Sequence, residues 1–167
     1  ELEHAVRVAR VSEQFFTILG LPASAGELRV DAGGQPSAVI SFTVAEQHKS
    51  ASDLVGRTLS IGDRTVLIAG VAPRHFRGLQ VGRECDVWLA LPPGGAARGD
   101  RRLSLIARVP RAADRERADA DLQRVSDELA TQYPTTNRGS FLDPTAARRI
   151  SLRPYSHLDP TANTQAI

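Results

Sequence analysis

Cysteine is almost absent from this sequence of 167 residues, because Cys85 is the only one. A single cysteine excludes a disulfide within the chain and a cluster of thiolate metal ligands. Long apolar runs are also missing: the longest, such as Val66 to Val71, are the length of a strand and fall short of the roughly 20 residues of a membrane-spanning helix. The start of the chain, Glu1-Leu2-Glu3-His4, lacks the basic and apolar regions of a signal peptide, so we expect a segment of a larger protein.

An excess of charge of either sign is lacking too, since 21 basic residues face 19 acidic ones. The arginines are scattered among acids and do not gather on one helix or tail, so no nucleic-acid partner is expected. Hydrophobic residues make up 41% and charged residues 24%, which is typical of a soluble globular protein. This length suffices for one domain or two small lobes, either of which buries about two-thirds of its unfolded surface.

The first 93 residues show the pattern of a small mixed α/β lobe. Its clearest feature is a hairpin in which Gly62-Asp63 forms a two-residue turn between apolar strands. Ser12 is predicted to cap a short helix that carries Phe15, Phe16 and Leu19 on its buried face and ends at Gly20. The predicted strands cover residues 2–11, 38–42, 59–61, 65–71 and 86–91, and a second short helix covers 43–49.

A proline- and glycine-rich stretch, residues 92–99, resembles a linker. We place the linker itself at 94–100, between a lobe of residues 1–93 and a second lobe of residues 101–167. The second lobe is predicted to be strand, helix, strand, with strands at 103–109 and 149–153 and a helix from Asp114 to Tyr133. Ala118, Leu122, Val125 and Leu129 recur at helical spacing and form its apolar stripe. The predicted fold class is therefore α+β.

A nucleophile with its base is the first kind of site to weigh, because Cys85, His75 and Asp86 include the residue types of a hydrolytic triad. Cys85 comes one residue before a predicted strand, with no strand-to-helix elbow and no glycine pair that would free amides for an oxyanion. A small buried apolar role fits it better, so we expect no catalytic residue and no enzyme.

Metal and phosphate sites are not indicated either. The histidines His4, His48, His75 and His157 show no metal-binding spacing. The pairs Gly33-Gly34 and Gly94-Gly95 lack the further residues of a P-loop or a dinucleotide fingerprint and are typical of flexible turns. No metal and no other cofactor is predicted.

The segment after the hairpin carries the strongest candidate for a binding site. Arg74, His75, Arg77 and Arg83 lie close together in sequence, and guanidinium groups match the geometry of carboxylates and phosphates. The other interpretation makes Phe76 and Leu79 the anchors that fold the segment back, with the cations solvated around them. We favour this scaffold interpretation and keep Arg74, His75, Arg77 and Arg83 as a candidate anion or partner contact.

Several blocks of this sequence, in order, resemble the extracytoplasmic domain of permeases of the MacB/FtsX type. The segment at 11–20 is similar to "VSxxYFxxLGL", 38–41 to "VAVIS", 54–59 to "VVGRTL", 66–73 to "xTVIGVAP", 76–79 to "FRGL" and 86–91 to "DVWVPL". Each block alone is weak evidence, and their common order is what makes the resemblance specific. It spans about residues 6–154, with Phe16 in place of the usual tyrosine and without the family's frequent "LW" at 43–49.

This resemblance implies a domain between the first and second transmembrane helices of an ABC-type permease, on the outer, periplasmic side of the cytoplasmic membrane. It implies a small α/β, sabre-like lobe and a porter-like lobe of two βαβ units, of which only the second is expected here. The expected partners are a second permease copy, a separate cytoplasmic ATPase subunit and a periplasmic adaptor. The expected role is transmission of ATP-driven motion, and the alternative is a ligand-binding domain for an anion held by Arg74 and Arg77.

Overall fold

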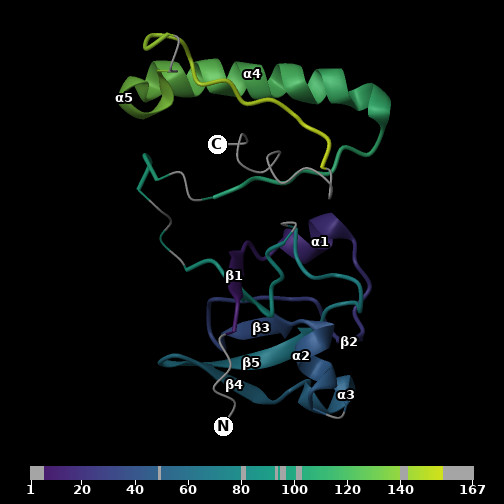
Figure 1. Cartoon of the computed structure of the whole chain (residues 1–167). Helices are drawn as coiled ribbons and strands as arrows, with labels where there is room; N and C mark the ends of the chain where they lie inside the picture. Colours follow the sequence, from purple (N-terminus) through teal and green to yellow (C-terminus); the bar gives the residue numbers. More distant parts are fainter. Residues whose placement is uncertain are drawn as a thin grey trace. The chain divides into compact units, whose positions relative to one another are not determined.

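The computed structural model describes most of the chain and divides it into two compact units. The described residues are 6–48, 50–79, 82–92, 94, 97–100, 103–139 and 143–155. Unit 1 comprises residues 1–95 and unit 2 comprises residues 96–167 (Figure 1). The predicted α+β fold class is confirmed, because a mixed sheet and several helices are both present.

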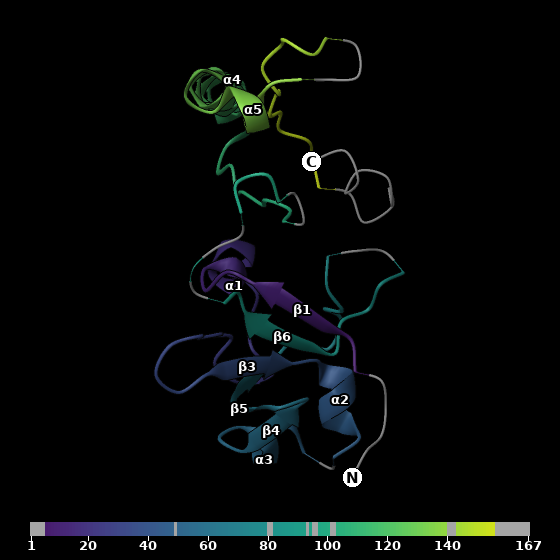
Figure 2. The ribbon, with the colours of Figure 1, turned by 90° about the vertical axis from the view of Figure 1, so that its left-hand side faces the viewer.

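Unit 1 is built on a six-stranded mixed sheet. The strands are β1 (Val8–Val11), β2 (Ala25–Gly26), β3 (Ser37–Ile40), β4 (Thr58–Ile61), β5 (Arg64–Val71) and β6 (Val87–Ala90). Their order across the sheet is β1-β6-β3-β5-β2, and β4 also pairs with β5. β1 is parallel to β6 and β3 is parallel to β5, whereas the pairs β6/β3, β5/β2 and β5/β4 are antiparallel. Figure 2 shows β1, β6 and β3 as successive neighbours.

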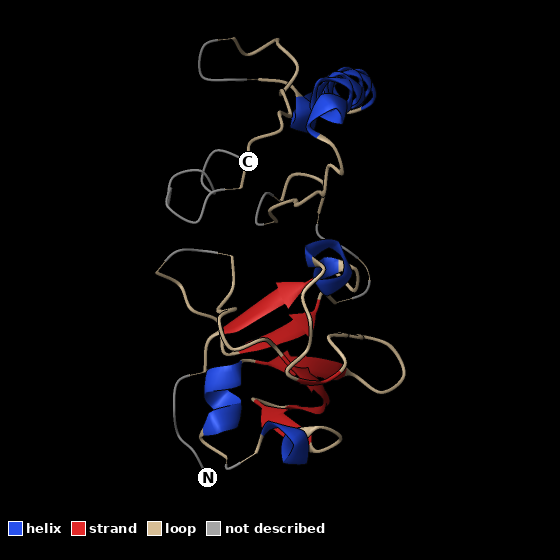
Figure 3. Cartoon of the chain, turned by 90° about the vertical axis from the view of Figure 1, so that its right-hand side faces the viewer, coloured by secondary structure: helices blue, strands red, loops and turns tan. Residues whose placement is uncertain are grey.

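Both faces of this sheet carry a hydrophobic core, which explains why β3 and β6 are buried along their whole length. One core contains Ile40, Ile68 and Leu89 and is covered by α2 (Phe42–Glu46) and α3 (Ala51–Leu54). The other contains Val39 and Trp88 and is covered by α1 (Phe15–Leu19). Figure 3 shows these short helices packed around the strands. Unit 1 therefore has helices on both sides of one sheet.

Local sequence signals account for several of these elements. The predicted hairpin is confirmed: Ile61 pairs with Arg64 across the two-residue turn, and Gly62 there has φ of 60°, a value that glycine adopts without strain. The Oγ of Ser41 accepts a hydrogen bond from the Val44 amide at 3.2 Å, so Ser41 caps α2. The second strand of the hairpin ends before Pro73, as predicted.

One sequence prediction at the start of unit 1 is wrong, and a second is observed only in part. Ser12 does not cap α1, which begins at Phe15 with Gln14 in the capping position and no capping hydrogen bond from a side chain. The Ser12 carbonyl instead accepts from the Phe15 amide, because a turn precedes the helix. The predicted strand 2–11 is observed only as β1, and residues 1–5 lie outside the described residues.

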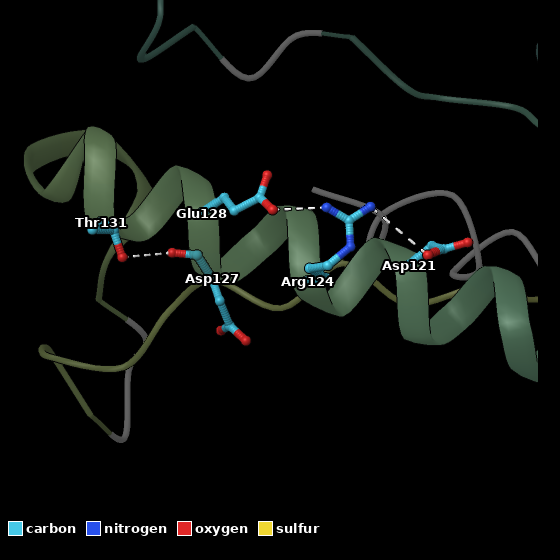
Figure 4. Close-up of polar contacts among 5 residues, drawn as sticks. All are labelled: Asp121, Arg124, Asp127, Glu128 and Thr131. Atoms are coloured by element: carbon cyan, nitrogen blue, oxygen red, sulfur yellow. Dashed lines mark hydrogen bonds and ion pairs between the residues drawn. The ribbon is translucent and has the colours of Figure 1, made fainter.

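Unit 2 contains one long helix, α4 (Arg115–Gln132), between a 3-10 turn, η1 (Ala112–Asp114), and a short helix, α5 (Pro134–Asn137). Asp114 directly precedes α4, as predicted, but makes no capping bond because its carboxylate accepts from Arg111 at 3.0 Å. On the outer face of α4, Arg124 contacts both Asp121 and Glu128 (Figure 4). None of the described helices is long and apolar enough to cross a membrane.

The predicted strands of unit 2 are not formed. Residues 103–109 and 149–153 belong to no strand of the structure, because neither segment has a neighbouring strand among the described residues to complete a ladder. Side chains of α4 bind the backbone at the second segment instead. Ser126 accepts from the Ile150 amide at 3.1 Å, Gln123 donates to the Ile150 carbonyl, and Asp119 accepts from the Leu152 amide at 2.9 Å. The apolar stripe of α4 is only half-buried, and Leu105 is 83% exposed.

Candidate functional site

The loop from Ala72 to Asp86 connects β5 with β6 and contains the four predicted site residues. The Ala72 amide donates to the Ile40 carbonyl at 2.9 Å, which continues the parallel pairing for one more residue. Pro73 then ends the ladder, since proline has no amide hydrogen to donate, and the Phe76 amide donates to the Pro73 carbonyl at 2.9 Å in a tight turn. The polypeptide therefore changes direction immediately after the sheet.

Phe76 anchors this turn in the core of unit 1. Its ring stacks on Trp88, with centroids 5.3 Å apart and an angle of 28° between the ring planes. It also meets Phe16 edge-on at 6.2 Å. Trp88 is only 1% exposed and lies in the middle of the sheet on β6. The loop is therefore attached to the most buried aromatic residue of the unit.

A second attachment closes the loop near the start of β6. The Cys85 amide donates to the Arg77 carbonyl at 2.8 Å, so the two ends of the segment between them are joined. Gly78 in this segment has φ of 107°, and a Cβ atom there would lie 3.4 Å from the Cβ of Cys85. Glycine therefore suits this position for its backbone conformation, whereas a Cβ atom would meet Cys85 only at an ordinary van der Waals distance.

Two of the four predicted site residues are held in ion pairs. Arg74 contacts Glu46 of α2 at 2.7 Å and lies over the ring of Phe42, with 4.6 Å between the guanidinium carbon and the ring centroid. Arg77 contacts Glu84 at 2.8 Å. All four charged side chains are about half exposed, between 49% and 63%. Neutralised arginines attract an anion less than free ones do, so these pairs favour the scaffold interpretation of the loop.

The other two predicted residues, His75 and Arg83, are exposed. They extend from the same loop, and neither forms an ion pair with another described residue. The structure thus places all four on one loop of unit 1 and brings none of them into a pocket with a described lining. A partner or anion contact by Arg74, His75, Arg77 and Arg83 stays a prediction.

Cys85 and Asp86, two of the residues weighed as a hydrolytic triad, make structural contacts instead. Cys85 is buried, and its Sγ lies 3.2 Å from the Val87 carbonyl oxygen and 3.6 Å from that of Arg7. Burial raises the pKa of the Cys85 thiol, although hydrogen bonds from the backbone at Ala9 and Val87 lower it in part. The raised pKa keeps the sulfur protonated at neutral pH and poorly nucleophilic.

Asp86 has a different structural task. Its Oδ2 accepts a hydrogen bond from the Arg7 amide at 2.8 Å, while its own amide donates to the Arg7 carbonyl at 2.8 Å. This reciprocal pair sets the register at which β1 joins β6. The carboxylate is therefore engaged with the backbone before β1, and the described residues supply no orienting partner for His75.

Metal binding finds no support in the part of the chain that the structure describes. No group of three or more histidine, cysteine, aspartate or glutamate side chains is placed there to hold an ion. His48 and His75 are exposed, and His4 and His157 lie outside the described residues. The glycine pair at 33–34 belongs to a turn in which Asp31 Oδ1 accepts from the Gly33 amide at 2.8 Å.

Sequence reasoning missed the partners that fix this loop. Glu46 precedes Arg74 by 28 residues and joins it only because α2 follows β3 and the loop follows β5, two neighbouring parallel strands. No local spacing signals such a pair. Phe42 was also missed as the surface under Arg74, since its sequence position indicated only the end of a strand.

The profile of a family described as "MacB-like periplasmic core domain" matches residues 1–125. Among curated proteins none matches. Among solved structures, the chain is similar to a domain assigned to a permease protein from Porphyromonas gingivalis, with 16% sequence identity and a TM-score of 0.47. The match covers 77% of this chain and 57% of that one, so this chain spans a little over half of the solved domain's length.

Proposed function

This chain belongs to the MacB-like periplasmic core domain family, and from that membership we propose that it transmits ATP-driven motion of an ABC-type permease to the periplasm. Domains of this family are parts of transporters and lie outside the cytoplasm. In the proposed role the chain makes and breaks no covalent bond. Its task is to move as a stiff body when the membrane-spanning part of the permease changes conformation.

The single observation that best supports this proposal is the attachment of the loop at 72–86. Phe76 packs on the buried Trp88 of β6, Arg74 is paired with α2, and the Ala72 amide is bonded to Ile40 of β3, while the Arg77 carbonyl is bonded to Cys85, two residues before β6. The loop therefore connects three elements of unit 1 by different kinds of contact. A displacement applied to it is passed to the sheet instead of being absorbed by bending.

We further propose the lobe identities that the family resemblance implies. Residues 1–93 form the small sabre-like lobe, 94–100 are the linker, and 101–167 supply the βαβ half of a porter-like lobe. The half-buried stripe of α4 and the 83% exposure of Leu105 support this assignment, because a βαβ unit covers such residues with a sheet. In the assembled lobe, segments 103–109 and 149–153 pair with strands of another βαβ unit.

The partners in this proposal are a second permease copy, a separate cytoplasmic ATPase subunit and a periplasmic adaptor. ATP binding and hydrolysis on the ATPase change the spacing between the two copies of this domain. The domain is then the periplasmic part of a protein of the cytoplasmic membrane. The transport reaction itself takes place on other parts of the assembly.

The test measures distances between the two domains in the assembled transporter. A spin label at Ser60→Cys, on the exposed outer strand β4, reports unit 1, and one at Gln132→Cys, at the end of α4, reports unit 2. Cys85 is buried, and Cys85→Ala removes it as a competing label site. We expect each pair of identical labels to change distance between the nucleotide-free and ATP-bound states, and an ATPase without its catalytic base to hold one distance.

Linker variants test whether the distance change depends on the connection between the two units. Replacing 94–100 by glycine and serine of equal length, and then of doubled length, should leave ATP hydrolysis intact. With the longer linker, the label pair in one unit should still change distance during the ATP cycle, and the label pair in the other unit should not. Distances that stay constant through the ATP cycle in the unaltered protein would refute the proposal.

A further inference from the structure

A groove with a volume of about 330 Å³ lies at one end of the sheet in unit 1. It is formed where β3 and β5 begin and where β1 and β6 end. Its lining includes Arg10 of β1, Leu89 and Ala90 of β6, Pro36 before β3, and Arg64 and Val66 of β5. Pockets of this size lie at the lower end of the range for small-molecule sites. None of the four residues in the candidate loop contributes to it.

The topology of the sheet places the two arginines on opposite sides of this groove. Arg10 is on β1 and Arg64 is on β5, and β6 and β3 lie between them. Three spacings between neighbouring strands amount to about 14 Å across the sheet. Between them, β6 contributes the apolar residues Leu89 and Ala90, and β3 contributes the buried Ser37. The groove thus has a cation on each flank and a mainly apolar floor.

The charge of these two arginines is available to a ligand. Both side chains are exposed, and no ion pair with either is found among the described residues. Arg74 and Arg77, in contrast, are both paired with glutamates. Asp31 is the one acidic residue in the lining, and its Oδ1 accepts from the Gly33 amide. Two positive charges against one negative charge leave the groove cationic.

We infer that this groove binds a small amphiphilic dianion, whose two acidic groups meet Arg10 and Arg64 and whose apolar stem lies over Leu89 and Ala90. Guanidinium groups bind carboxylates with two parallel hydrogen bonds, and an apolar stem gains from leaving water. At about 30 Å³ for each group of the size of water, about eleven such groups fill the groove. Straight-chain dicarboxylates with about eight carbons have this size and chemistry.

The test titrates the 167-residue chain with a series of straight-chain dicarboxylates, from succinate to dodecanedioate, at low ionic strength. Amide NMR shifts locate the site, and calorimetry gives the affinity. We expect suberate to shift amides at residues 31–37, 64–66 and 89–92, and the affinity to pass through a maximum along the series. Added salt should weaken binding, because both contacts are charged and exposed. Dimethyl suberate, which has the same stem without charge, should not bind.

Variants identify the residues responsible. Arg10→Gln and Arg64→Gln should each weaken suberate binding about tenfold, and the double variant should abolish it. Thr65→Phe should block the groove, because Thr65 is exposed in its lining. Arg57→Gln is the matched control, since Arg57 is an exposed arginine of unit 1 outside the lining, and it should leave the affinity unchanged.

The inference is independent of motion transmission, so its failure leaves the proposed function untouched. Fluorescence of Trp88 shows whether each variant is folded. Arg64→Gln lies at the exposed hairpin turn, so it carries the test if Arg10→Gln does not fold. Absence of binding at millimolar suberate, or an equal loss of affinity in Arg57→Gln, would overturn the assignment.

Discussion

Replacing Phe76 by alanine is the sharpest test of whether the loop at 72–86 is part of the scaffold. The ring of Phe76 contacts Trp88 at 5.3 Å and Phe16 at 6.2 Å between centroids, and the residue is half-buried. Fully buried phenylalanines cost about 3 to 5 kcal/mol on truncation to alanine. Scaling for partial burial and adding the lost aromatic pairs, which include one with Phe15, gives an expected loss of about 2 to 3 kcal/mol in the free energy of unfolding of unit 1.

Urea denaturation followed by tryptophan fluorescence measures this loss directly. Trp88 is the only tryptophan, and it lies in the core of unit 1, so the signal reports this unit alone. With an m-value of about 1 kcal/mol/M, which suits a unit of this size, the midpoint should fall by about 2 to 3 M. Because Phe76 stacks on Trp88, the native spectrum should change as well.

Two control variants on the same loop distinguish a scaffold from a binding surface. Arg74→Ala removes an exposed ion pair and a cation–π contact, which together stabilise by about 1 kcal/mol. His75→Ala removes an exposed side chain and should change the unfolding free energy by less than about 0.5 kcal/mol. If Phe76→Ala cost no more than His75→Ala, the scaffold interpretation of the loop would be refuted.

Three further predictions follow from other contacts. Gly70→Ala should destabilise unit 1 by about 2 to 3 kcal/mol in the same assay, because its Cβ would lie 2.3 Å from the Glu27 carbonyl oxygen. Cys85 has a raised pKa in the folded state, so folding retains its proton and stability should fall as pH rises above about 8.5, the thiol's unfolded value. Cys85→Ala should remove that fall, and an unchanged pH profile would contradict the assigned cause. Ser126→Ala should cost unit 2 about 1 kcal/mol and speed hydrogen exchange at the Ile150 amide, which it binds at 3.1 Å.

Much of unit 1 could be predicted because its signals are local. The Gly62 turn, the strand ending before Pro73 and the helix ending at Gly20 all follow from backbone preferences of single residues, and each is observed. The order of the strands could not be predicted, since β3 pairs with β5 and β6, which are distant in sequence. The same holds for the pair of Arg74 with Glu46. Contacts that depend on topology leave no mark in the spacing of residues.

The failure in unit 2 has the opposite cause. Segments 103–109 and 149–153 have the composition of strands, but a strand is stable only beside another strand. The described residues provide none, and α4 binds Ile150 and Leu152 through its side chains instead. The apolar stripe of the helix was located correctly by its period, although it is only half-buried. Composition therefore indicates that these segments can form strands, and the presence of a neighbouring strand decides whether they do.

The two units differ in how firmly their parts are held, and this difference bears on the proposed transmission of motion. In unit 1, β3 and β6 are buried throughout and pair on both edges, so neither of them can shift without breaking several backbone hydrogen bonds together. In unit 2, the segment beside α4 is held by bonds from single side chains, each worth about 1 kcal/mol. A domain that transmits displacement must deform less under load than the segments that connect it to the rest of the protein. The pairing of β3 and β6 in unit 1 favours the proposed role, and the loop anchored at Phe76 on Trp88 is the part through which we expect an applied displacement to reach the sheet.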